Sequence, residues 1–335
     1  MNNDLISKNL QDYFFKEFGK ENVISIEQKA NKTINLIYKC ITKKANFYAK
    51  ILVRQPKRKN EYFRLEKEAS LYKQLRHFNK TQGLSKEEQY FIPVPEVYDI
   101  LIDEEIIGYK TLILSELSGE NLDLIWFNLS SKHQKDILLQ LALIIKQLHT
   151  IEYDLFGDIE NYDSPRQFFS FKSLLKANLR KYITILSKNK FLSIKLLTEI
   201  ELVLEKALKK QSFHWSPILV HDDLNPSNFM IKKEKTSWKI SGFFDFEWAY
   251  AGIPLTDLYR LRDNFSLTNE QERIFLRKYG LDINYLDEKF REQILILQII
   301  QLLESLAIGW ISFHPTDENL LYAKKRLVEI KEKLS

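Results

Sequence analysis

Residues 221–228 carry the side chains of this chain that are best suited to chemistry. His221, Asp223 and Asn228 stand in the spacing His-x-Asp-x4-Asn, and Asp245 follows 17 residues after Asn228. Phosphoryl transfer needs one carboxylate that positions a hydroxyl and accepts its proton. It also needs an amide and a second carboxylate that hold Mg²⁺ on a phosphate chain. The spacing therefore indicates phosphoryl transfer.

Each of these residues has a predicted role in that chemistry. Asp223 would orient the attacking hydroxyl, Asn228 would reach Mg²⁺ from the far end of the loop, and Asp245 would be the main metal carboxylate. His221 is interpreted as a hydrogen-bonding scaffold for the loop. A plain surface turn also uses Asp, Asn, Pro and Ser. The apolar-flanked Asp245, with a hairpin expected before it, favours the phosphotransferase over the turn.

A lysine that holds the α- and β-phosphates is expected late in a strand that follows a hairpin. Lys50, at the end of the stretch 47–50, fits that position. A carboxylate on the following helix would orient its ammonium group, and Glu68 lies on the apolar side of that helix. Arg54 is the rival of Lys50, and Glu66 is the rival of Glu68. Ordinary surface charges are the other interpretation, because the region is rich in them.

The first third of the chain is rich in expected strands. Apolar spacing predicts helices over residues 4–18 and 61–78. Alternating and β-rich stretches predict strands, which cover residues 23–26, 34–41, 47–53, 96–102 and 109–114. A polar turn joins the second and third of these strands, so we expect an antiparallel hairpin there.

The remainder is mostly helical, with helices expected over residues 131–149, 167–187, 192–210, 287–311 and 318–333. A hairpin of 229–232 with 238–244 would separate the loop from the downstream acid. Strands followed by helices predict an α+β fold. We expect two lobes: residues 1–117, an antiparallel sheet plus helix that binds nucleotide, and residues 118–335, a mostly helical catalytic and substrate-binding lobe.

The composition is that of an ordinary globular protein, with 335 residues, 44% hydrophobic and 28% charged. The single cysteine, Cys40, excludes an intrachain disulfide. With a polar N-terminal stretch, it predicts a cytoplasmic location. Gln298, Gln301 and Glu304 interrupt the apolar stretch 294–313, which predicts a buried amphipathic helix and no membrane span.

The net charge of +5 is unevenly distributed, because residues 31–80 hold 14 Lys and Arg against three acids. We expect most of these to line a solvated surface. A positive potential that attracts a polyphosphate is the second interpretation. The region lacks a nucleic-acid-binding motif or aromatic platform. The expected partners are therefore a nucleoside triphosphate and a small hydroxylated acceptor, with neither nucleic acid nor membrane.

These motifs resemble those of the aminoglycoside phosphotransferase and choline kinase family. The segment 244–258 is similar to the acidic stretch of that family, which runs into Gly-x-Pro-x-x-Asp-Leu. Residues 92–95 and 148–149 also match, and the similarity extends from about residue 20 to 265. The resemblance implies a two-lobed protein-kinase-like fold, Mg²⁺ as cofactor, and ATP or GTP as phosphate donor.

The stretch 112–120 is similar to the hinge of that family, which binds the nucleotide base. The resemblance implies that backbone groups of Ser115, Glu116 and Leu117 meet a purine edge.

Two departures from the family pattern affect the expected site. The family usually carries a glycine in its first hairpin loop, but residues 28–35 contain none. Because glycine lets the backbone approach a phosphate closely, side chains such as Thr33 and Asn35 would have to substitute. Asp222 is an extra acid next to the expected base. It would either bind a cationic substrate or cap the loop.

A small acceptor is predicted in preference to a protein. Protein kinases carry a long activation segment before an Ala-Pro-Glu anchor, whereas Asp257 follows Asp245 within twelve residues and no such anchor exists. We expect an aminoglycoside-type antibiotic or related metabolite, with a choline- or ethanolamine-type or other metabolite as the alternative. Candidate wall residues of the acceptor site are Asp263, Glu304 and Trp310.

The two acceptor classes need different walls. A polyamine sugar needs carboxylates, and a quaternary ammonium needs an aromatic cage, for which Trp126, Trp248 and Tyr250 are candidates. Two other hypotheses stay open. A catalytically inactive, kinase-like nucleotide-binding protein is favoured by the missing glycine. A nucleic-acid-binding module would use residues 31–80 and bind with a steep salt dependence.

Overall fold

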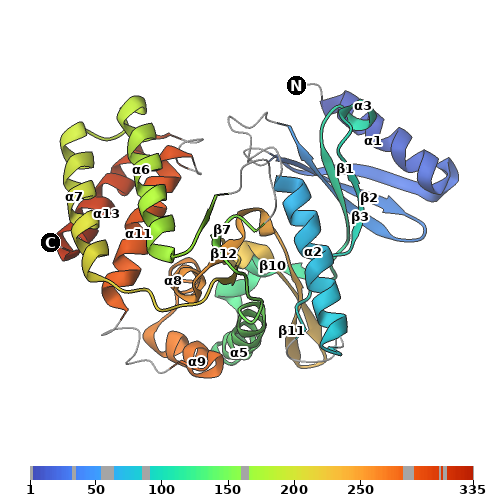
Figure 1. The fold of residues 1–335 in the computed structure, drawn as a ribbon. Helices are drawn as coiled ribbons and strands as arrows, with labels where there is room; N and C mark the ends of the chain where they lie inside the picture. Colours follow the sequence, from blue (N-terminus) through green and yellow to red (C-terminus); the bar gives the residue numbers. More distant parts are fainter. Residues whose placement is uncertain are drawn as a thin grey trace. The chain divides into compact units, whose positions relative to one another are not determined.

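The computed structural model describes residues 3–31, 35–53, 64–84, 91–159, 166–281, 290–308, 311 and 315–334. The chain forms two compact units, each built from two segments. Unit 1 comprises Met1–Gln147 and Asp223–Ala249, and unit 2 comprises Leu148–Asp222 and Tyr250–Ser335. The described residues have the predicted α+β architecture, with an N-terminal antiparallel sheet (Figure 1). The division of the chain into two lobes after residue 117 stays a prediction.

A five-stranded antiparallel sheet in the order β1-β2-β3-β5-β4 forms the first part of unit 1. Its strands are β1 (Val23–Asn31), β2 (Asn35–Thr42), β3 (Asn46–Leu52), β4 (Val97–Leu101) and β5 (Thr111–Ser115). The register of β2 with β3 pairs Ile37 with Lys50 and Lys39 with Tyr48. The predicted hairpin is therefore confirmed.

The helices of unit 1 are α1 (Asn3–Phe18), α2 (Arg64–Thr81), α3 (Glu104–Ile107), α4 (Leu122–Ile125) and α5 (Ser131–Leu148).

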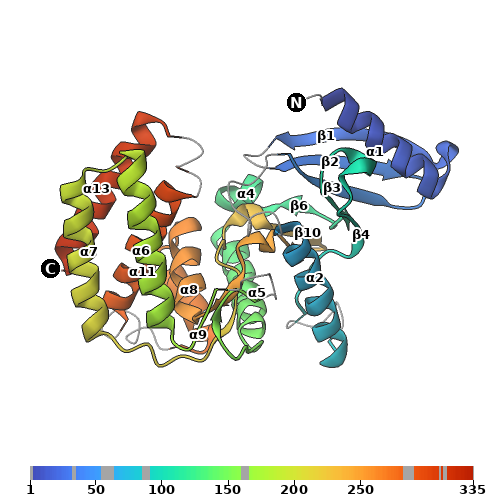
Figure 2. The same cartoon turned by 45° about the horizontal axis from the view of Figure 1, so that its top comes forward.

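Strand periodicity decides which way Lys50 points. The buried side chains of Ala49 and Ile51 join Leu10 and Phe14 of α1 in one hydrophobic core. Figures 1 and 2 both show α1 lying along the sheet. Because successive side chains alternate between faces, Lys50 points to the opposite side.

The acidic stretch between β4 and β5 forms the short helix α3. The side chain of Asp103 accepts a hydrogen bond from the Glu105 N–H and caps α3. Gly108, with φ of 91°, ends the helix in the left-handed region.

A second sheet of unit 1 carries the motif loop. It has the order β11-β10-β6 and consists of β6 (Glu120–Asn121), β10 (Phe229–Glu234) and β11 (Ser237–Phe243). β10 and β11 form the predicted hairpin. The 3₁₀ turn Pro226–Asn228 enters β10, and the chain leaves β11 two residues before Asp245.

Unit 2 has short strands and long helices. Its sheet has the order β8-β7-β12-β9, with β7 (Phe156–Gly157), β8 (Gln167–Phe168), β9 (Ile218–Val220) and β12 (Tyr250–Gly252). Its helices are α6 (Phe171–Asn189), α7 (Ile194–Lys210), α8 (Pro254–Asn264), α9 (Asn269–Tyr279), α11 (Arg291–Ala307) and α13 (Asp317–Leu334). Among the described helices, none has both the length and the apolar content of a membrane span.

The helix expected from residue 167 begins at residue 171. Gln167 and Phe168 pair with β7 as strand β8. The Ser170 side chain then caps α6 by accepting a hydrogen bond from the Ser173 N–H. The strand pairing and the cap together delay the helix.

The close approach of Gly119 to β10 gives a test of unit 1. Gly119 has φ of 111°, and an added Cβ would lie 2.2 Å from the carbonyl oxygen of Ile231. We expect Gly119→Ala to lower the free energy of unfolding by about 3 kcal/mol, from strain and clash together. Gly108→Ala is the matched control, since its φ is also positive but nothing lies within 4 Å. It should cost about 1 kcal/mol. Urea titration measures both, and equal losses would contradict the close approach.

Candidate functional site

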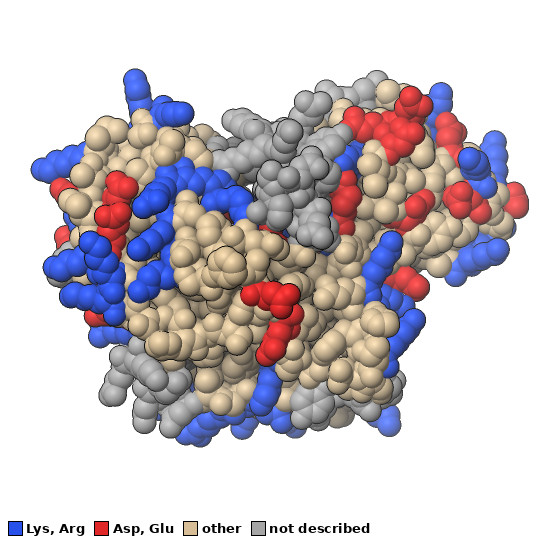
Figure 3. All heavy atoms as spheres, in the orientation of Figure 1, with Lys and Arg blue, Asp and Glu red and all other residues tan. Residues whose placement is uncertain are grey.

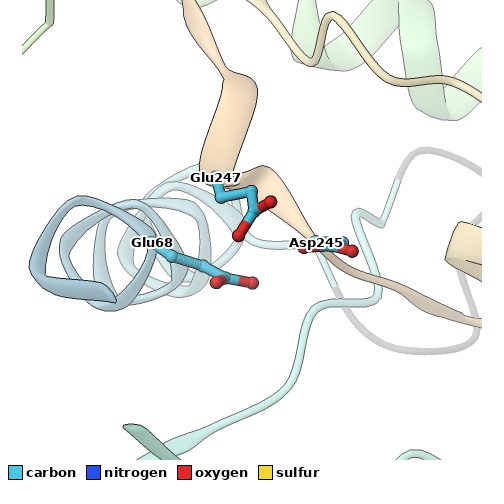
Figure 4. A group of neighbouring side chains, drawn as sticks. All are labelled: Glu68, Asp245 and Glu247. Atoms are coloured by element: carbon cyan, nitrogen blue, oxygen red, sulfur yellow. The ribbon is translucent and has the colours of Figure 1, made fainter. Parts of the chain in front are cut away.

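The ammonium group of Lys50 lies among three carboxylates of unit 1. Its Nζ is 2.7 Å from Glu68 Oε2, 2.7 Å from Asp245 Oδ1 and 3.1 Å from Glu247 Oε2. Glu68 comes from α2, and the two other acids follow β11. One oxygen of each carboxylate lies within 4.8 Å of the others (Figure 4). The sequence-predicted residues Lys50, Glu68 and Asp245 are thus brought together, and Glu247 joins them.

The structure pairs the rival acid elsewhere. Glu66 contacts the ammonium of Lys110, so it is Glu68 that bonds to Lys50. Arg54, the rival of Lys50, lies outside the described residues.

Burial and charge act against each other in this cluster. The side chain of Lys50 is 9% exposed and that of Glu68 is 2% exposed. Burial disfavours the ammonium, yet the carboxylates of Asp245, Glu247 and Glu68 outweigh it and hold the pKa of Lys50 well above its usual range. Burial raises the pKa of Glu68. Asp245 and Glu247 raise it further, while Lys50 opposes them. The carboxylates therefore hold more negative charge than one ammonium compensates.

Tyr72 fixes two of these acids from α2. Its hydroxyl donates a hydrogen bond to Glu68 Oε1 at 2.6 Å and accepts one from the Asp245 N–H at 2.9 Å. Asp245 has a left-handed backbone with φ of 70°, a conformation that persists only where the surroundings enforce it. The Tyr72 bond is one such constraint.

Two amides orient the carboxylate of Asp223. The Asn228 side chain donates to Asp223 Oδ2 at 3.1 Å and to its carbonyl oxygen at 2.9 Å, while the Asn225 side chain donates to Oδ1 at 3.1 Å. The carbonyl oxygen of Asn228 accepts the N–H of Phe244 at 3.1 Å, directly before Asp245. The loop and the downstream acid are therefore linked through the backbone. Asn225 was missed as a positioning residue, although it lies within the motif.

In unit 2, Asp257 anchors the start of the motif. Its Oδ2 accepts the N–H of His221 at 2.9 Å, and its Oδ1 accepts the N–H of Asp222 at 2.8 Å. His149 Nε2 lies 3.0 Å from Oδ2, and its Nδ1 lies 2.7 Å from the Tyr279 hydroxyl. Burial alone would raise the pKa of Asp257, but the bonds from His149 and His221 outweigh it and lower this pKa.

The extra acid Asp222 is paired within unit 2. Its Oδ1 lies 2.9 Å from Arg260 Nη2, and its backbone has φ of 61°. Asp and Asn adopt this left-handed conformation more readily than most residues. Of the two interpretations made for Asp222, this geometry favours a role in shaping the loop.

The predicted hinge lies at the end of β5. The Ser115 N–H donates to the Glu96 carbonyl oxygen at 2.8 Å, and the Glu116 N–H donates to the Asn46 carbonyl oxygen at 3.0 Å. The Glu116 carboxylate binds Lys39 at 2.6 Å. A purine edge would have to meet other backbone groups of the segment, such as those of Leu117, and this contact stays a prediction.

The two acidic residues that were predicted to line the acceptor site lie in unit 2. Asp263 accepts hydrogen bonds from Arg262 at 3.1 Å and from Gln298 at 3.0 Å. Glu304 accepts the hydroxyl of Tyr182 at 2.7 Å. Trp310 lies outside the described residues.

The aromatic candidates have partners of their own. Trp126 is buried in unit 1. The guanidinium carbon of Arg64 lies over the ring of Trp248, 4.2 Å from the ring centroid. The hydroxyl of Tyr250 lies 3.4 Å from Thr256 Oγ1 in unit 2. An aromatic cage for a quaternary ammonium stays a prediction.

Comparison with known proteins gives one family. The model of the "Phosphotransferase enzyme family" matches residues 26–291. The curated proteins contain no match.

Solved structures share the fold over nearly the whole chain. The gentamicin complex of APH(2")-IIa is 19% identical, with a TM-score of 0.65 over 95% of each chain. The "Putative fructosamine-3-kinase" from Haemophilus somnus 129PT is 18% identical. Its TM-score is 0.64, over 96% of this chain and 97% of that chain. A thermostable mutant of APH(4)-Ia with ADP and hygromycin B is 14% identical. Its TM-score is 0.67, over 97% of this chain and 98% of that chain. The predicted protein-kinase-like fold is confirmed.

The anchor formed by Asp257 should contribute strongly to stability. In Asp257→Asn, the amide would turn an N–H toward one of the two backbone donors. We expect the free energy of unfolding to fall by about 2–3 kcal/mol at pH 7. Asp263→Asn is the control, since that side chain is 45% exposed, and it should change stability by less than about 0.5 kcal/mol.

The same pair of proteins tests the lowered pKa. A carboxyl whose pKa is lower in the folded state contributes stability above its unfolded pKa and loses it as pH falls. The difference between wild type and Asp257→Asn should therefore shrink below about pH 4. Denaturant titrations from pH 3 to 7 measure it, and a pH-independent difference would contradict the assignment.

Proposed function

The chain belongs to the phosphotransferase enzyme family, and we propose that it transfers the γ-phosphate of ATP or GTP to a hydroxyl of a small acceptor. Its enzyme class, a kinase acting on a small molecule, is the one that the sequence motifs predicted. The observation that carries the proposal is the arrangement in unit 1. There the cluster of Lys50 and Asp245 is linked through Asn228 to the oriented carboxylate of Asp223.

Asp223 is the proposed catalytic residue. Amide donors bind both oxygens of its carboxylate, which fixes the direction of the carboxylate. In phosphoryl transfer the protein contributes mainly by positioning and charge neutralisation. Asp223 would therefore hold the acceptor hydroxyl in line with the γ-phosphate and take its proton as the new bond forms.

Lys50 and the metal ligands have complementary proposed roles. The Lys50 ammonium, kept charged by its acids, would bind the α- and β-phosphates, and Glu68 would hold it in place. The carboxylate of Asp245 and the side-chain oxygen of Asn228 are the hard oxygen donors that Mg²⁺ prefers. When bound there, Mg²⁺ would neutralise charge on the β- and γ-phosphates.

Helix α6 of unit 2 is strongly basic. Helix α6 carries five basic residues and no acid, and Figure 3 shows Lys and Arg side chains gathered over the place of α6. A polycation such as an aminoglycoside would be repelled by this helix. An acceptor that binds beside α6 would therefore be neutral or anionic rather than polycationic.

An acceptor screen tests the proposed function. The protein, Mg²⁺ and either ATP or GTP are incubated with aminoglycosides, choline, ethanolamine, neutral sugars and sugar acids, and mass spectrometry detects any acceptor that gains a phosphoryl group. We expect a product from at least one hydroxylated metabolite. Nucleotide binding without a product from any acceptor would favour an inactive nucleotide-binding protein.

Substitution of Asp223 tests its role. Asp223→Asn should lower kcat by about 100- to 10,000-fold, because the proton acceptor is lost. It should leave nucleotide affinity within about twofold. Asp123→Asn, on the exposed first turn of α4, is the control and should keep wild-type turnover. Steady-state kinetics and calorimetry measure the two quantities. Near-normal kcat in Asp223→Asn would show that another group is the base.

A further inference from the structure

Helix α8 holds the residue that directly precedes the proposed base. The carboxylate of Asp257 accepts the N–H of Asp222 at 2.8 Å, and Arg260 Nη2 lies 2.9 Å from Asp222 Oδ1. Asp257 and Arg260 are three residues apart in α8, a spacing that places two side chains on the same side of a helix. One side of α8 therefore fixes both the backbone and the side chain of Asp222.

The backbone of Asp222 needs this support. Its φ of 61° lies in the left-handed region, a conformation that costs energy in any residue with a Cβ. A peptide bond joins Asp222 to Asp223, so the φ and ψ of Asp222 set the direction in which the chain continues into the proposed base. If the backbone of Asp222 relaxed, the carboxylate of Asp223 would turn with it.

The charge of Asp222 needs the same helix. The side chains of Asp222 and Arg260 are 10% and 11% exposed, and a carboxylate so far removed from water is costly unless it is paired. The proposed base is the next residue, so an uncompensated charge on Asp222 would also act on Asp223. The guanidinium of Arg260 supplies the compensating charge.

Arg260 is itself held in place from α11. Its guanidinium carbon lies over the ring of Tyr259, 5.9 Å from the ring centroid. The hydroxyl of Tyr259 donates a hydrogen bond to Gln301 Oε1 at 2.8 Å. Contacts therefore run from α11 through α8 to Asp222, and they limit the directions that the guanidinium can take.

We propose that Arg260 is a positioning residue for Asp223 and that it acts through Asp222. The inference rests on the proposed function, because Asp223 is the base in that account. Arg260 is required because Asp222 places a buried charge on a left-handed backbone. Glycine adopts that backbone freely and carries no charge, so Asp222→Gly should remove most of the need for Arg260.

An ion pair that only stabilises unit 2 makes a different prediction. Both accounts expect Arg260→Met to unfold at a lower temperature, because a buried carboxylate loses its partner. Only the positioning account expects turnover to fall at temperatures where the variant is fully folded, with the KM for nucleotide preserved. The split between kcat and KM therefore separates the two accounts.

Turnover can be measured before any acceptor is known. The full-length protein is given Mg²⁺ and ATP, and water serves as the acceptor. Water attacks the γ-phosphorus, the bond to ADP breaks, and Asp223 takes the proton of the water. Release of inorganic phosphate gives kcat and KM, and circular dichroism confirms that each variant is folded at the assay temperature.

Arg260→Met should lower kcat by about 10- to 100-fold, because a small displacement of a catalytic group has effects of that size. It should leave the KM for ATP within about twofold. The double variant with Asp222→Gly should recover most of the loss, to within about threefold of wild type. Arg260→Lys keeps the charge and should lose less than Arg260→Met.

Arg262→Met is the matched control on the same helix. Arg262 pairs with Asp263 at 3.1 Å, but these side chains are 29% and 45% exposed. Because an exposed ion pair contributes little, this variant should keep wild-type kcat.

Amide hydrogen exchange tests the inference without turnover. The N–H of Asp222 should exchange about tenfold faster in Arg260→Met and at nearly the wild-type rate in the double variant, while the amides of β2 stay unchanged. Equal losses with and without Asp222→Gly, or a wild-type kcat and exchange rate in Arg260→Met, would overturn the inference. If the wild-type protein releases no phosphate, the exchange rates alone decide.

The outcomes for the two proposals are distinct. Phosphorylation of an acceptor by a protein in which Arg260→Met has no effect would leave the proposed function standing without the inference. The expected kcat and exchange rates, with no phosphorylated acceptor in the screen, would support the role of Arg260 and contradict the proposed transfer to a small molecule.

Discussion

The buried ammonium group of Lys50 connects parts of unit 1 that lie far apart in the sequence. It binds Glu68 of α2 and Asp245 beyond β11, so one charge joins the sheet, the helix and the acidic segment. Buried acids and bases need such partners, because removing one leaves an uncompensated charge in a poorly solvated place. The hydroxyl of Tyr72 and the backbone of Asn228 then fix the segment around Asp245. The geometry proposed for phosphoryl transfer depends on this one cluster.

The sequence predicts those parts of the site whose placement follows from local periodicity. Strand alternation turns Lys50 away from the core that holds Ala49 and Ile51, and helical spacing turns Glu68 inward. Spacing leaves Glu66 as a rival, however, and only the contact of Glu66 with Lys110 separates the two acids. The hairpins and long helices are equally predictable, since each has its own apolar pattern.

Other contacts leave no local signal. Asn35 and Glu247 are 212 residues apart, and their pairing follows only from the tertiary fold. The anchor of Asp257 to His149 joins residues 108 apart, although both lie in motifs that the sequence singles out. Strands β7 and β8 have two residues each, too few to show an alternating pattern. Long-range polar contacts and minimal strands therefore define the limit of prediction from this sequence.

A crystal structure with a non-hydrolysable ATP analogue and Mn²⁺ tests the central claim most directly, because anomalous scattering locates the metal. The account predicts metal bound to Asp245, the ammonium of Lys50 on the α- and β-phosphates, and the carboxylate of Asp223 facing the γ-phosphate. Metal and phosphates bound away from Asp245 and Lys50, or a carboxylate of Asp223 turned away from the γ-phosphate, would contradict it.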